Sequence, residues 1–241
     1  MDKIQTRYFI TKVGVGSVYK RPGFNSECMT ETVYGESNKI LKYQKDWVYV
    51  KCEDGYKGWV NKFYGEESIL QNNPRYIVAY PNDCGLFNPN FPFGSKVKKR
   101  LKGTIRISKF LGPDNIISIA SNLLNIPYKW GGKTSLGFDC SGLVQTVFKV
   151  CGFEIPRDAF EQKEFFKDCE IKLQDSKPGD LHFFGKKNKI THVACSTGGL
   201  GILHSQGIVK KESLNPKDDK FNKNLLDLYL SSNSLRLKFK R

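Results

Sequence analysis

The stretch that decides the fold is residues 139–152, which read Asp-Cys-Ser-Gly-Leu-Val-Gln-Thr-Val-Phe-Lys-Val-Cys-Gly. Asp139 can cap a helix, because its side chain accepts hydrogen bonds from the unpaired N–H groups of a first turn. Apolar residues then recur every three or four positions, and Gly152 suits the left-handed turn that ends a helix. The stretch therefore predicts a helix over residues 140–151 that begins with a cysteine, Cys140.

A cysteine in this position is placed for nucleophilic chemistry. A thiol attacks a carbonyl only as a thiolate, and the start of a helix carries about half a positive charge, which favours the thiolate. We therefore expect the position of Cys140 to lower its pKa, and the same N–H groups can hold an oxyanion. A helical cysteine is more often a small buried hydrophobe. We also give His182 a structural role. The other six cysteines are assigned the role of buried hydrophobes: Cys28, Cys52, Cys84, Cys151, Cys169 and Cys195.

The proton acceptor for the thiol is sought among only three histidines. Alternation along a strand puts His192 and Ala194 on one face, so we expect this imidazole to project toward the helix as the base while Val193 and Cys195 pack behind. His204 lies on the next expected strand. It can bond the far ring nitrogen of His192 and fix its tautomer, as an Asp or Asn does elsewhere.

The chain around this helix divides into three regions. Short β runs broken by turn residues, with Gly55 in the last turn, predict a small β barrel in residues 1–71. Residues 72–112 are expected to form a β-rich bridging segment or a second, degenerate barrel. Residues 113–241 are expected to form a second domain, which starts with a helix capped by Asp114 or Asn115. Its expected strands are 181–184, 191–196 and 201–205, followed by a helix at 222–230 and a strand at 235–239.

Composition bounds the function classes. The 241 residues are 39% hydrophobic, which suffices for a folded core, and 39 Lys and Arg against 24 Asp and Glu give a formal charge of +15. Acidic partners are attracted by such a charge, but the basic residues are scattered without stacking aromatics, which argues against nucleic acid. Seven unpaired-looking cysteines, no apolar leader and no stretch of roughly 20 apolar residues predict a soluble cytoplasmic protein without membrane contact.

Five sequence blocks resemble, in the same order, those of the NlpC/P60 family of papain-like cysteine peptidases. The resemblance covers roughly residues 113–207, and it implies an α+β fold with helices packed on an antiparallel sheet. It also implies Cys140 as nucleophile, His192 as base and His204 as third catalytic residue, with no metal or organic cofactor. The blocks are Pro127–Gly132, Gly137–Leu143, Ile155–Gln162, Pro178–Phe184 and Thr191–Ala194.

The amino-terminal barrel resembles a bacterial SH3 domain. This pairing is similar to the γ-D-glutamyl-L-diamino acid endopeptidases, which cut murein peptides that have a free amino-terminal L-Ala. The resemblance implies a murein tripeptide or related muropeptide as substrate. The residues that it implies for substrate binding are Asp139, Ser141, Glu27, Tyr56, Tyr128 and Trp130.

Two departures from the family and several alternatives remain. Ala159 stands where many relatives carry a Ser that bonds the substrate, and His182 replaces an apolar residue of its strand. Arg157 and Asp158 either recognise a substrate carboxylate or form a structural ion pair. The rival functions are a murein hydrolase on intact wall, a non-catalytic wall-peptide-binding module, and an acyltransferase or amidase with the same nucleophile.

Overall fold

The computed structural model describes residues 5–80, 88–187 and 189–239, and the chain divides into two compact units. Residues 1–109 and 130–136 form the first unit, and residues 110–129 and 137–241 form the second. The segment that we expected to bridge two domains, 72–112, thus falls almost wholly within the first unit. Cys84, to which we gave a structural role, lies outside the described residues.

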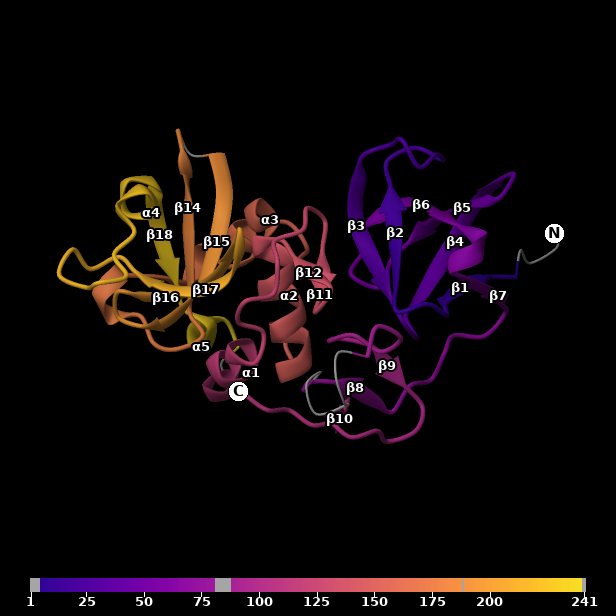
Figure 1. Cartoon of the computed structure of the whole chain (residues 1–241), viewed down its shortest axis with the longest axis horizontal. Coiled ribbons are helices and arrows are strands. Elements are labelled where there is room, and N and C mark those ends of the chain that lie inside the picture. The colour runs from indigo at the N-terminus through magenta and orange to yellow at the C-terminus, as the bar shows by residue number, and fades with distance from the viewer. Residues whose placement is uncertain (1–4, 81–87, 188, 240–241) are drawn as a thin grey trace. The chain divides into compact units, whose positions relative to one another are not determined.

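The first unit contains an SH3-like barrel (Figure 1). Its seven antiparallel strands lie in the order β3-β2-β6-β5-β4-β1-β7 around buried apolar side chains that include Phe9, Val18 and Val60. Gly55 has φ +89° in the turn between β5 and β6, as the sequence predicted. The elements are β1 (Tyr8–Thr11), β2 (Val15–Tyr19), β3 (Cys28–Val33), β4 (Ser37–Gln44), β5 (Trp47–Lys51), β6 (Lys57–Asn61), η1 (Lys62–Tyr64) and β7 (Gly65–Ser68).

Two further segments complete this unit. A three-stranded antiparallel sheet is formed by β8 (Tyr76–Val78), β9 (Lys96–Val97) and β10 (Thr104–Arg106), in the order β10-β8-β9. The backbone N–H of Lys96 bonds the carbonyl of Tyr34 at 2.8 Å, which ties this sheet to the barrel. The segment 130–136 carries β11 (Lys133–Thr134), and Lys133 is buried there against Glu36 and Asp54 at 3.4 and 3.2 Å.

The second unit is an α+β domain. Six of its strands form one antiparallel sheet in the order β13-β18-β14-β15-β16-β17. The elements are η3 (Pro113–Asn115), α1 (Ile116–Ser121), β12 (Gly137–Phe138), α2 (Cys140–Cys151), α3 (Ala159–Phe165), η4 (Lys167–Cys169), β13 (Glu170–Ile171), η5 (Leu173–Asp175), β14 (Leu181–Lys186), β15 (Lys189–Gly198), β16 (Gly201–Gln206), β17 (Ile208–Ser213), α4 (Lys223–Leu228), β18 (Tyr229–Asn233) and α5 (Leu235–Lys238).

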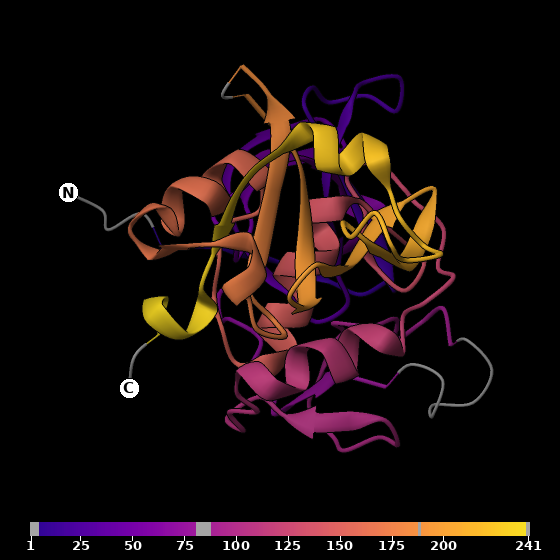
Figure 2. The same ribbon diagram turned by 90° about the vertical axis from the view of Figure 1, so that its left-hand side faces the viewer.

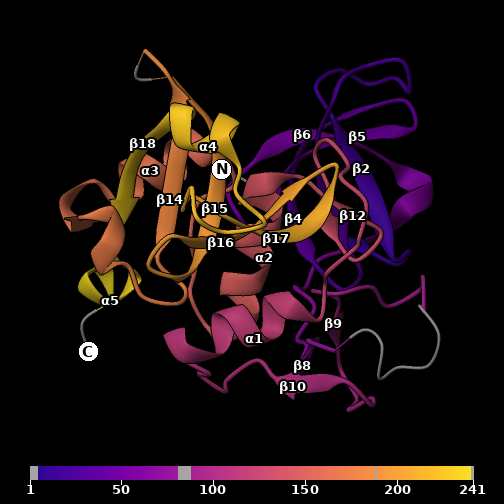
Figure 3. The same cartoon turned by 60° about the vertical axis from the view of Figure 1, so that its left-hand side comes forward.

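Helices cover both faces of this sheet. The helix α2 packs on β15 and β16, and α4 lies on the opposite face against β14 (Figure 2). The short helix α1 packs beside α2 (Figure 3). Because both faces are covered, apolar side chains are required on both sides of the central strands.

The end of the chain differs from the sequence prediction. The strand expected at 235–239 is wrong, because residues 235–238 form α5, whose cap Ser234 accepts a hydrogen bond from the N–H of Leu237. The strand of this region is β18, which pairs with β13 and β14. Within residues 5–80, 88–187 and 189–239, no helix is long and apolar enough to cross a membrane.

Candidate active site

The start of α2 presents Cys140. Oδ1 of Asp139 accepts a hydrogen bond from the N–H of Gly142 at 2.6 Å, and Gly152, with φ +94°, ends the helix. Burial, then the Asp139 carboxylate, raises the pKa of the Cys140 thiol to about 11, although backbone hydrogen bonds from Val193 and Ser141 favour the thiolate. Our expectation of a lowered pKa is therefore wrong, because desolvation outweighs the helix terminus.

The two histidines lie on adjacent strands. Nε2 of His192 on β15 and Nδ1 of His204 on β16 are 3.0 Å apart. Burial, then the neighbouring His204, lowers the pKa of His192 to about 3. Because the backbone of Val193 is close enough to lower the pKa of the Cys140 thiol and Val193 follows His192 in the chain, Cys140 lies near the strand segment that carries this imidazole.

The faces that we predicted for Ala194 and Cys195 on β15 are wrong. Burial, then the nearby Cys151 of α2, raises the pKa of Cys195 to about 12, so Cys195 lies toward α2 rather than behind the strand. Ala194 packs with Phe184 and Leu225 on the α4 side. The prediction assumed a sheet with one covered face, whereas α4 buries the second face too.

A glutamate that the sequence reading missed extends the histidine pair. Nε2 of His204 lies 2.9 Å from Oε2 of Glu212 on β17. Oε1 of Glu212 is paired with Lys210 at 2.8 Å, and the side-chain amide of Asn222 donates to Oε2 at 2.6 Å. Burial raises the pKa of Glu212, but these hydrogen bonds together lower it. A tight turn at Gly207 pairs His204 with Lys210, two residues before Glu212. The register of this hairpin is the sequence signal that could have revealed Glu212.

Arg157 forms a buried ion pair at the helix start. Its Nη2 lies 2.6 Å from Oδ2 of Asp139, and its Nη1 lies 3.0 Å from Oδ1 and 3.0 Å from Oγ of Ser141. Both carboxylate oxygens are thus engaged, and the arginine is 2% exposed. Of the two roles that we left open for Arg157, the geometry supports the structural ion pair. Asp158 precedes α3, and Ala159 is the first residue of that helix.

The other predicted substrate-binding residues are divided between the units. In the second unit, burial, then the nearby Cys140 and Asp139, raises the pKa of Tyr128 to about 12, which places the phenol near the thiol. In the first unit, Trp130 is 65% exposed, Glu27 forms an exposed ion pair with Lys20 at 3.2 Å, and Tyr56 packs partly buried on the barrel core.

The remaining histidine has a buried, structural environment. His182 is fully buried, with Nδ1 at 2.8 Å from Oγ of Ser232, and its Nε2 has no hydrogen-bond partner among the described residues. The six described cysteines are free thiols. In the described part of the chain, no group of three His, Cys, Asp or Glu side chains could hold a metal ion.

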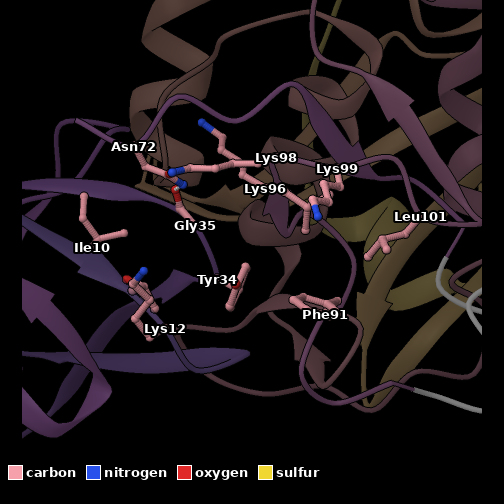
Figure 4. A pocket seen from close by; sticks show the side chains of 12 residues that line it. Ile10, Lys12, Tyr34, Gly35, Asn72, Phe91, Lys96, Lys98, Lys99 and Leu101 are labelled. Carbon is pink, nitrogen blue, oxygen red and sulfur yellow. Dashed lines mark hydrogen bonds between the residues drawn. The ribbon is translucent and has the colours of Figure 1, made fainter. Parts of the chain in front are cut away.

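A pocket of about 330 Å³ lies in the first unit, where Tyr34 and Phe91 are flanked by lysines (Figure 4). Lys12 and Lys96 are each paired with a carboxylate, of Glu66 and Glu53 respectively. Among the residues that the structure describes, its lining includes no cysteine, histidine or carboxylate. We therefore place the candidate chemistry at the start of α2 and not in this pocket.

A cysteine at the start of a helix that packs on an antiparallel sheet, with histidines on that sheet, belongs to the papain-like class of α+β fold. Residues 125–227 match the NlpC/P60 family, and residues 18–62 match the bacterial dipeptidyl-peptidase SH3 domain. The chain therefore contains an NlpC/P60 domain preceded by a bacterial SH3 domain.

Individual relatives agree with this assignment. The chain is 29% identical over 214 residues to the γ-D-glutamyl-L-lysine dipeptidyl-peptidase of Bacillus subtilis strain 168, an alignment of 73% of this chain and 71% of the relative. It is 27% identical to the protein of the same name from Bacillus cereus strain ATCC 10987, over 73% of this chain and 66% of the relative. An NlpC/P60 family crystal structure from Bacillus cereus ATCC 10987 has the same fold, with a TM-score of 0.78 and 18% identity over 95% of this chain and 99% of that chain.

Proposed function

We propose that the chain is a cysteine peptidase with Cys140 as nucleophile and His192 as base. One observation carries the proposal: the thiol at the start of α2 lies near the backbone of Val193, the residue directly after His192, and the ring of His192 bonds the ring of His204. The NlpC/P60 domain and the peptidases among its relatives support the same class.

The proposed reaction is acyl transfer to water. His192 accepts the Cys140 proton as sulfur attacks the carbonyl, and the protonated imidazole then gives its proton to the leaving amine. In the described part of the chain, no acceptor bonds the backbone N–H of Cys140, so this N–H is available to the oxyanion. Water, deprotonated by His192, then releases the acid from the thioester.

The proposed substrate is a murein peptide cut between γ-D-Glu and a diamino acid, with a free amino-terminal L-Ala. The activity for which the two Bacillus relatives are named supports this bond and suggests L-Lys as the diamino acid. An ammonium needs acceptors, which Asp139, Glu27 and Tyr56 supply in this proposal. Because Arg157 engages both oxygens of Asp139 and the N–H of Gly142 bonds Oδ1, about one lone pair of that carboxylate is left for the substrate.

We further propose that Ser141, Tyr128 and Trp130 contact the peptide and that the protein acts in the cytoplasm on recycled wall peptides. The rival enzyme acts on intact wall, where the charge of +15 would attract it to acidic polymers. Whole sacculi and the free tripeptide L-Ala-γ-D-Glu-L-Lys separate these functions. The recycling enzyme cleaves the tripeptide and leaves both sacculi and the N-acetylated tripeptide intact.

The test of the nucleophile is Cys140→Ala. We expect tripeptide cleavage to fall by about a thousandfold or more, with circular dichroism and the melting temperature unchanged. Cys169→Ala is the matched control, because Cys169 lies beside the edge strand β13 and should leave turnover as it is. Undiminished turnover by Cys140→Ala would sink the peptidase proposal. Tight tripeptide binding without cleavage by the unaltered protein would instead support the binding module.

A further inference from the structure

The histidine pair ends on a carboxylate. Nε2 of His192 meets Nδ1 of His204 at 3.0 Å, and Nε2 of His204 meets Oε2 of Glu212 at 2.9 Å. His204 is fully buried, and the Glu212 side chain is 20% exposed. All three residues lie in the second unit, on the neighbouring strands β15, β16 and β17.

The order of donors along this chain follows from the carboxylate. An ionised carboxylate only accepts hydrogen bonds, so Nε2 of His204 must carry a proton. Neutral His204 then has an unprotonated Nδ1, which accepts from Nε2–H of His192. Neutral His192 is left with an unprotonated Nδ1, and this nitrogen is the one free to take a proton.

We propose that Glu212 is a positioning residue that fixes the tautomers of both His204 and His192 and so keeps Nδ1 of His192 basic. The catalytic role of Nδ1 of His192 rests on the proposed function, whereas the assignment of the two tautomers does not. Without the acceptor, His204 can carry its proton on Nδ1. His192 must then present a bare Nε2 to it, and its Nδ1 becomes protonated and useless as a base.

The surroundings keep Glu212 ionised and oriented. Lys210 supplies a cation at 2.8 Å from Oε1, and Nδ2 of Asn222 donates to Oε2 at 2.6 Å. Asn222 is itself held in place, because its Oδ1 caps α4 by accepting from the N–H of Leu225 at 2.9 Å. The other titratable group facing this carboxylate is His204, and no second carboxylate of the described residues bonds it.

The decisive variant is Glu212→Leu, which removes every side-chain acceptor from this position. Two-bond ¹H–¹⁵N NMR of ¹⁵N-histidine-labelled protein reads each tautomer directly. Only three histidines contribute, and a His182→Leu variant identifies the signal of His182. We expect Nε2–H tautomers at His192 and His204 in the unaltered protein and Nδ1–H forms in Glu212→Leu. Glu212→Asp should retain the Nε2–H forms.

Kinetics supply the second readout. We expect Glu212→Leu to lower kcat by about 10- to 100-fold with little change in KM, less than the loss for an acid bonded directly to the base. Glu170→Leu is the matched control, since Glu170 is an exposed carboxylate at the other edge of the same sheet. Unchanged tautomers in Glu212→Leu overturn the proposal, whatever the rate. If the Glu212 variant changes the tautomers but the unaltered protein cleaves no peptide, the positioning role is upheld and the proposed function is refuted.

Discussion

Arg157 holds both carboxylate oxygens of Asp139, with Nη2 at 2.6 Å from Oδ2 and Nη1 at 3.0 Å from Oδ1. The same carboxylate caps α2 through the N–H of Gly142. One buried ion pair thus fixes the residue directly before the proposed nucleophile. The Asp139 side chain thus both caps α2 and neutralises the charge of Arg157.

Removal of the guanidinium should be costly. Arg157→Met leaves the Asp139 carboxylate buried without this counter-charge, so we expect the free energy of unfolding to fall by about 3–5 kcal/mol in urea denaturation. Arg7→Met is the comparison, because that arginine is 60% exposed and pairs with Glu67 at 3.5 Å, so its loss should cost at most about 1 kcal/mol. Equal losses in the two variants would contradict a structural role for the Arg157 pair.

The hydrogen bond between the histidines predicts an order of activity. His204→Asn keeps a carbonyl oxygen that can accept from Nε2–H of His192, whereas His204→Leu offers no acceptor. We expect His204→Asn to retain about tenfold more tripeptide turnover than His204→Leu, and His192→Ala to be inactive. Equal turnover in the two His204 variants would argue against an orienting role.

His182 should make the fold acid-sensitive. Burial lowers its pKa to about 4 from 6.5, so below pH 6.5 the unfolded chain takes up a proton that the folded chain refuses. Stability that is full above pH 6.5 is therefore lost as the pH falls toward 4, by roughly 3 kcal/mol in total.

His182→Leu removes this contribution and also a buried Nε2 that no described residue bonds. We expect the variant to gain stability relative to the unaltered protein between pH 7 and pH 5 in urea titrations. His192 and His204 affect both proteins alike, so the difference isolates His182. A stability difference that does not change with pH would refute the assignment.

Lys133 anchors the segment 130–136 in the first unit. The lysine is 3% exposed, its ammonium lies near Glu36 and Asp54, and its backbone N–H donates to Oε2 of Glu31 at 3.0 Å. We expect Lys133→Met to lower the free energy of unfolding by about 3 kcal/mol or more. Lys12→Met, at an exposed pair with Glu66, is the control and should cost under about 1 kcal/mol.

Local patterns predicted much of the fold and part of the site. The cap at Asp139, the helix from Cys140 to Cys151 and its end at Gly152 all depend on neighbours within a few residues, and the structure confirms them. The β runs of the barrel and the strands that carry His192 and His204 were also predicted. The strand expected at 235–239 failed, because the Ser234 cap and the packing of α5 outweigh a short apolar run.

The sequence by itself determined the helix that begins at Cys140 and the spacing of His192 and His204, because these follow from caps, periodicity and strand alternation. Tertiary structure alone decided that Glu212 ends the histidine chain, that Arg157 occupies Asp139, and that burial sets the pKa of Cys140. Those relations join residues from different elements. They depend on sheet register, on a second covered face and on desolvation, none of which is written in a local pattern.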